Sequence, residues 1–118
     1  FITEFFRRTG AFQMNHHVIV QNRILREHPW VAMELFNAFQ SSKEVAYERA
    51  RKVSAGYLYF PSNVFQEQAD IFGEDPYPLG IRAMRNSFDK YIEAMLDSGA
   101  IKTPIAMDQV YYPTTLDT

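Results

Sequence analysis

The chain has 118 residues, of which 47% are hydrophobic and 15% aromatic, and a formal net charge of -2 at pH 7. This composition provides enough apolar side chains for a packed core and excludes a disordered chain, and the length fits a single segment over residues 1–118. The basic residues are scattered among acids, which argues against nucleic acid as a partner. No apolar run reaches the roughly 20 residues of a membrane helix. The chain has no cysteine, which excludes disulfides and thiolate chemistry.

The first half of the chain predicts three helices and one strand. Residues 1–8 carry apolar side chains at helical spacing and end at a glycine, Gly10. Residues 18–20 are branched and apolar, which favours a short strand. Asn22 is placed to cap a helix over 23–28, and Pro29 then opens a long helix from Trp30 to about residue 55, which we expect Gly56 to end.

The second half predicts further helices around a rigid loop. Residues 57–60 are expected to be extended, and Ser62 to cap a helix over 63–72 that Gly73 closes. Two prolines stiffen the loop 74–78. Apolar residues at three- and four-residue steps then predict an amphipathic helix over 79–97, ended by Gly99, and a short helix is expected over 106–111.

A lone strand indicates an incomplete fold. The backbone donors and acceptors of residues 18–20 need partners, and we expect them in polypeptide outside this sequence or in another copy of the chain. The chain begins at Phe1, in the middle of what reads as ordinary folded sequence, so we expect a processed or truncated chain.

His16 and His17 form the only histidine pair, at the entrance to the predicted strand. Adjacent strand residues point to opposite faces, so at most one of them faces a given site. An imidazole there would suit proton transfer near neutral pH. The alternative is a structural pair satisfied by backbone groups. No third histidine or cysteine stands at zinc-ligand spacing, so no metal site is predicted.

The loop from Asp75 to Gly80 leads into the helix over 79–97. A helix start presents free amides and favours anions, so a substrate carboxylate is expected to dock there with help from Arg82 or Arg85. The alternative is that Asp75 only caps the helix and Arg85 only braces this loop.

Two aromatic motifs have structural interpretations. Trp30, after Pro29, is expected to fill an apolar contact at a helix start, and Tyr111 with Tyr112 to hold the C-terminal tail in place. No residue pattern implies a metal or organic cofactor.

Several segments, taken together, resemble the C-terminal portion of the 4,5-dihydroxyphthalate decarboxylase-like family. They are Arg8-Thr9-Gly10 with His16 and residues 18–20, His28-Pro29-Trp30-Val31-Ala32 with Leu35 and Ala38-Phe39, Asp75-Pro76-Tyr77-Pro78 with Gly80 and Arg85, and Val110-Tyr111-Tyr112-Pro113 with Thr115. The resemblance spans nearly the whole chain and rests on the ordered set. Gln13 departs from it, because the family commonly has proline there.

The resemblance implies an α/β, helix-dominated fragment with one or two strands, forming the C-terminal part of a two-lobed fold like the type II periplasmic binding proteins. It implies a carboxy-lyase that removes carbon dioxide, without oxidation, from an aromatic dicarboxylate bound between the lobes. His16 would supply or relay the proton, while Arg85 and Asp75 would contact the substrate. The remainder of the protein's own chain would be its partner, and a cytoplasmic location is expected.

Two other functions compete with this one. A non-catalytic solute-binding protein of a transporter would use the same cleft, and an export signal upstream of Phe1 and a periplasmic location would favour it. A helical interaction domain that self-associates as a homo-oligomer would instead fold alone.

Overall fold

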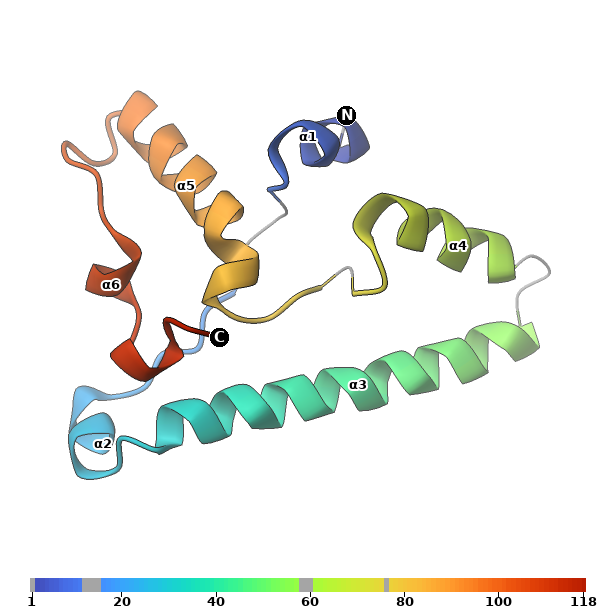
Figure 1. The fold of residues 1–118 in the computed structure, drawn as a ribbon, viewed down its shortest axis with the longest axis horizontal. Helices are drawn as coiled ribbons and strands as arrows, with labels where there is room; N and C mark the ends of the chain where they lie inside the picture. The colour runs from blue at the N-terminus through green and yellow to red at the C-terminus, as the bar shows by residue number, and fades with distance from the viewer. Residues whose placement is uncertain (1, 12–15, 58–60, 76) are drawn as a thin grey trace.

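The structure of the chain is a computed structural model. The structure describes the backbone of residues 2–11, 16–57, 61–75 and 77–118, and the side chains of these residues except 53–57 and 61–65. The regular elements of this part are helical (Figure 1): α1 (Ile2–Thr9), α2 (Asn22–Glu27), α3 (Val31–Tyr57), α4 (Pro61–Phe72), α5 (Ile81–Asp97), α6 (Met107–Val110) and a final 3₁₀ turn, η1 (Pro113–Thr115).

The predicted helices are confirmed, with ends shifted by a few residues. α1 stops before Gly10 and α5 before Gly99, and both glycines have positive φ, as helix-terminating glycines do. α2 begins at Asn22 with Gln21 as its N-cap, so the expected Asn22 cap is wrong. α4 begins at Pro61, one residue before the expected Ser62 cap, because proline fits the first helical turn.

α3 runs further than predicted. Gly56 was expected to end it, yet the helix continues to Tyr57. A single glycine costs only about 1 kcal/mol in a helix, which the rest of this long helix offsets. The expected extended segment therefore does not include Tyr57, and its residues 58–60 lie outside the described residues, as do Gln13 and Pro76.

The predicted strand does not form in this chain. Residues 16–21 have neither helical nor strand hydrogen bonding, and the described residues contain no strand. Val18 is 59% and Ile19 93% exposed, so the described residues do not bury the side chains whose pattern indicated a strand. A single extended segment becomes a strand only when a neighbour supplies its backbone partners.

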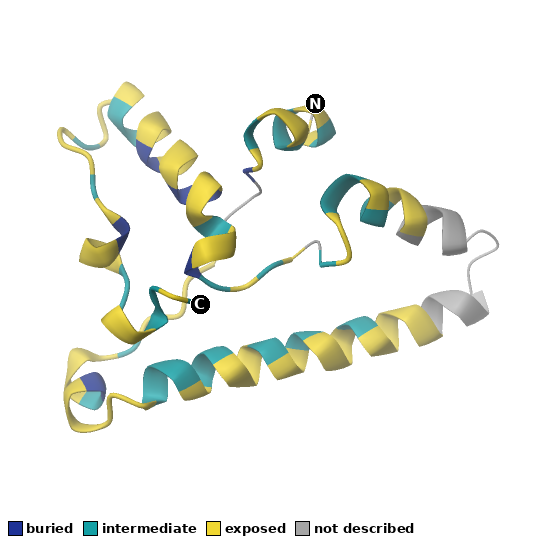
Figure 2. Cartoon of the chain, in the orientation of Figure 1, coloured by how far each residue is buried: buried dark blue, intermediate teal, exposed yellow. Residues whose placement is uncertain are grey.

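The core lies between α5 and the segment that follows it. Ile81, Phe88 and Ile92 recur on one face of α5 and pack with Met107 at the start of α6. Figure 2 shows buried positions as isolated dark bands among intermediate and exposed stretches. Other apolar side chains pack partly buried against them: Leu96, Ile101, Ile105, Tyr111 and Leu116.

The chain exposes more surface than a folded protein of its mass. Its solvent-accessible area is 9285 Å² for 13.8 kDa, against about 6,600 Å² for a compact monomer. Its radius of gyration is 17.3 Å, against about 13.5 Å for a compact domain of this length. α3 contacts α2, α4 and η1 and extends along one edge of the molecule (Figure 1), which accounts for the open shape.

No helix in the described part of the chain combines the length and the apolar character that a membrane crossing requires.

Candidate functional site

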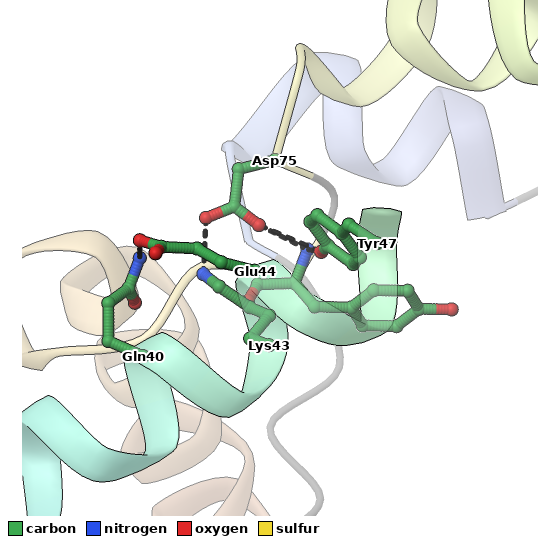
Figure 3. Close-up of polar contacts among 6 residues, drawn as sticks. Gln40, Lys43, Glu44, Tyr47 and Asp75 are labelled. Atoms are coloured by element: carbon green, nitrogen blue, oxygen red, sulfur yellow. Dashed lines mark hydrogen bonds and ion pairs between the residues drawn. The ribbon is translucent and has the colours of Figure 1, made fainter. Parts of the chain in front are cut away.

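A polar cluster joins Lys43 and Tyr47, in the middle of α3, to Asp75 in the loop before α5 (Figure 3). With Tyr77, whose backbone bonds both α3 residues, we call these residues the Lys43 cluster. Lys43 Nζ donates to Asp75 Oδ2 at 2.5 Å and to the Tyr77 carbonyl at 3.2 Å. The Tyr47 hydroxyl donates to Asp75 Oδ1 at 2.9 Å and accepts the Tyr77 amide at 3.2 Å. Lys43 and Tyr47 stand four residues apart on α3, so they reach the same carboxylate from one face of the helix.

The charges of this cluster are mutually stabilised. Partial burial acts to raise the pKa of Asp75, but hydrogen bonds from Lys43 and Tyr47 and the Lys43 charge outweigh it, so this pKa lies below its ordinary value. Burial, together with the bond to Asp75 and its negative charge, raises the pKa of Tyr47 to about 12. Near neutral pH, Asp75 is therefore an anion and Tyr47 a neutral phenol.

Asp75 also forms part of the wall of a small cavity of about 140 Å³. The walls come from α1, α4, α5 and the loop between the last two, and are mainly apolar: Phe6, Gly10, Phe72, Asp75, Pro78, Ala83, Met84 and Ser87. Phe6 and Phe72 meet edge to face across this junction, with ring centroids 5.0 Å apart. The cavity is comparable to engineered cavities of about 150 Å³ that admit one benzene ring.

The start of α5 is occupied by the chain itself. The Arg82 amide donates to the Thr118 carbonyl at 2.8 Å and the Ile81 amide to Thr118 Oγ1 at 3.2 Å. The Arg82 side chain pairs with Asp117 at 3.0 Å. These contacts satisfy the amides on which the expected carboxylate would dock. In this structure, Thr118 therefore occupies the expected anion site.

Asp75 does not cap α5. The N-cap of that helix is Gly80, which has a φ of 101° and lies so close to Thr118 that a Cβ would be 2.8 Å from the Thr118 carbonyl carbon. The alternative interpretation of Asp75 as a helix cap is therefore wrong. Its carboxylate is held by α3, a helix that begins more than 40 residues earlier in the chain.

Arg85 lies on α5 with an exposed side chain. The ion pair of Asp75 within the described residues is with Lys43 and not with Arg85. No hydrogen bond or ion pair joins any two of the described residues His16, Asp75 and Arg85. The catalytic role of His16 and the substrate-binding roles of Arg85 and Asp75 remain predictions.

Of the two adjacent histidines, His17 contacts Tyr111. His16 and His17 both lie in the exposed segment before α2. His17 Nε2 lies 2.7 Å from the Tyr111 hydroxyl, and the two rings stack with centroids 5.7 Å apart. Tyr112 donates to the Leu25 carbonyl at 3.3 Å, so the expected docking role of Tyr111 and Tyr112 is confirmed.

Trp30 behaves differently from its expected role as an apolar contact. It lies in the turn before α3, is 62% exposed and meets the ring of His28 at 6.0 Å. Within the described residues, no three carboxylate, imidazole or thiolate groups are gathered as a metal ion would require.

Sequence reasoning missed Lys43 and Tyr47. Their four-residue spacing on a predicted helix places them on one face, which is a signal that the sequence contains. Their partner Asp75 has no such signal, because it lies 28 residues beyond Tyr47 and only the fold brings it there.

No family model matches the chain. A curated relative, a 4,5-dihydroxyphthalate decarboxylase from Comamonas testosteroni, is 22% identical over 116 residues, which cover 97% of this chain and 35% of that protein. The chain thus spans about a third of the length of the relative it matches. The similarity suggests a distant relationship to a protein that is named a decarboxylase.

Proposed function

We propose that this chain is the C-terminal part of a two-lobed, type II periplasmic-binding-protein-like protein that removes carbon dioxide from an aromatic dicarboxylate. The observation that carries the proposal is the similarity to the decarboxylase, which runs through 97% of this chain while covering 35% of the relative. This chain therefore aligns with one part of that longer relative.

The surface of the chain supports the same proposal. It exceeds that of a compact monomer by about 2,700 Å² of accessible area. Large apolar side chains, among them Ile19 and Trp30, are exposed. Burying them against further polypeptide of the same protein would remove this apolar surface from water. The segment at residues 18–20 would then pair with a strand from that polypeptide.

The proposed chemistry needs a proton for the ring carbon and a group that holds a substrate carboxylate. Breaking the bond between the ring and its carboxylate releases carbon dioxide and leaves an electron pair on the ring carbon, which must take up a proton. His16 is proposed as the group that supplies or relays this proton. Arg85, exposed on α5, is proposed to hold a carboxylate of the substrate.

Asp75 is proposed to accept a hydrogen bond from a substrate hydroxyl. Its Oδ2 accepts one hydrogen bond, from Lys43, among the described residues, and a carboxylate oxygen has two acceptor positions. Its negative charge, sustained by the Lys43 cluster, favours a hydroxyl over a second carboxylate as its partner.

The test uses the protein that contains this chain together with its flanking polypeptide. Purified protein is incubated with 4,5-dihydroxyphthalate, and released carbon dioxide and 3,4-dihydroxybenzoate are quantified. The proposal expects equimolar products, and it expects His16→Ala to lose turnover while the protein stays folded. Tight binding of the substrate without carbon dioxide release would overturn the enzyme and favour a solute-binding protein. Unchanged turnover and affinity in His16→Ala would remove this residue from the mechanism.

A further inference from the structure

The contact between His17 and Tyr111 spans 94 residues of sequence. It combines a 2.7 Å hydrogen bond at Nε2 with stacked rings at an interplanar angle of 30°. Two simultaneous constraints fix both the position and the plane of the His17 ring. The segment that carries this ring has no regular secondary structure of its own.

Tyr111 is in turn fixed by the core. Its ring meets that of Phe88 at 5.9 Å, and Phe88 is only 5% exposed in the centre of the cluster on α5. The Tyr111 amide also donates to the Met107 carbonyl at 2.9 Å, which ties its backbone to the end of α6. Burial raises the pKa of the Tyr111 hydroxyl, so near neutral pH it keeps the proton that it can donate to His17.

These contacts connect the core to the residue next to His17. The 16–21 segment leads into α2 (Figure 1), and Gln21 is the N-cap of that helix. His16 directly precedes His17 in this segment, so the contacts that fix the His17 ring also restrict the backbone that carries His16. We propose that Tyr111, through His17, is a positioning unit that orients His16 toward the substrate.

This inference rests on the proposed function and deepens it. An acid that protonates a ring carbon must lie within hydrogen-bond reach of that carbon's position, and small misplacements lower the rate strongly. His16 is exposed, and its segment has no regular secondary structure among the described residues, so its side chain would otherwise sample many orientations. The His17–Tyr111 contact restricts them before substrate binds.

The experiment compares four variants of the complete protein, together with His16→Ala, in steady-state decarboxylation. Tyr111→Phe keeps the ring but removes the hydroxyl, and His17→Ala removes the imidazole. His17→Gln is the conservative variant, because its amide nitrogen can replace Nε2 as a partner of the Tyr111 hydroxyl. Tyr112→Phe is the matched control, because it removes a tyrosine hydroxyl that bonds the Leu25 carbonyl and not a histidine.

We expect Tyr111→Phe and His17→Ala to lower kcat about tenfold with little change in KM, which is the order of effect of one hydrogen bond. His17→Gln should recover most of the wild-type kcat, and Tyr112→Phe should retain it. A merely structural contact would instead reduce the folded fraction and leave kcat per folded molecule unchanged. ¹⁵N NMR of the imidazoles adds an independent readout, in which the wild type shows one His17 tautomer and Tyr111→Phe a mixture.

Three results would overturn the inference. The first is a kcat of Tyr111→Phe equal to that of Tyr112→Phe. The second is an active His16→Ala beside an inactive His17→Ala, which would make His17 the reacting group. The third is a kcat of His17→Gln as low as that of His17→Ala. Wild-type protein that releases no carbon dioxide marks a different failure, because it removes the proposed function and the positioning role with it.

Discussion

Replacing Asp75 with asparagine tests whether the Lys43 cluster holds the loop before α5 against α3. The Lys43 side chain is 12% exposed and that of Asp75 is 42% exposed, so the pair is partly shielded from water. Asparagine keeps an acceptor for Tyr47 and removes the charge that Lys43 pairs with. A partly buried ammonium then loses its counter-charge and retains only neutral acceptors.

The expected loss is about 1–2 kcal/mol in the free energy of unfolding. A hydrogen bond between charged groups contributes about 1.5–3 kcal/mol, and the exposure of Asp75 reduces this. Asp117→Asn is the matched control, because it breaks an ion pair whose side chains are 71% and 91% exposed. Such a pair contributes less than about 1 kcal/mol.

Urea unfolding of the protein measures both variants. With an m-value of about 2 kcal/mol/M, the Asp75→Asn midpoint should fall by about 0.5–1 M at unchanged m, and the Asp117→Asn midpoint by clearly less. The pH dependence of the free energy of unfolding tests the charge of Asp75 separately. Because the folded pKa of Asp75 lies below its ordinary value of 3.8, its contribution is present above that value and is lost as the pH falls through the lower folded pKa.

The difference between wild type and Asp75→Asn should therefore shrink as the pH falls below about 4. Equal midpoints for the two variants at neutral pH, or a difference that persists undiminished at pH 2, would refute this account of the cluster.

Two further substitutions test other contacts. Gly80→Ala should lower the free energy of unfolding by about 1–3 kcal/mol, because φ at Gly80 is 101° and the new Cβ would meet Thr118 at 2.8 Å. Gly73→Ala is the control, with a φ of 81° and open space around it, and should cost less. Equal losses in urea unfolding would contradict the steric argument. The raised pKa of Tyr47 predicts stability that is full below pH 10 and lost as the pH rises through about 12. A tyrosinate absorbance step near that pH should be missing from Tyr47→Phe, and a wild-type curve identical to the variant's would count against the raised pKa.

The helices could be predicted because their causes are local. α1, α4 and α5 end at glycines that the sequence displays, and the apolar positions of α5 recur at helical steps. α3 shows the limit of local reasoning. One glycine was expected to end it, but the end of a helix depends on the sum over all its residues, and Gly56 alone did not decide it.

The candidate site was predicted less well, since its contacts are not local. Asp75 was singled out as a residue at a helix start, yet its carboxylate bonds two residues of α3. The anion site expected at the start of α5 is filled by Thr118. Both outcomes depend on which segments pack together.

The sequence alone determined where the chain turns helical and that residues 18–20 are apolar and branched, because hydrogen bonds within a helix join residues four apart and branched side chains act on their own backbone. Only the tertiary structure decided that Lys43 meets Asp75 and that His17 meets Tyr111. Those pairs lie 32 and 94 residues apart, and packing of the core around Phe88 and the course of α3 bring their atoms within reach.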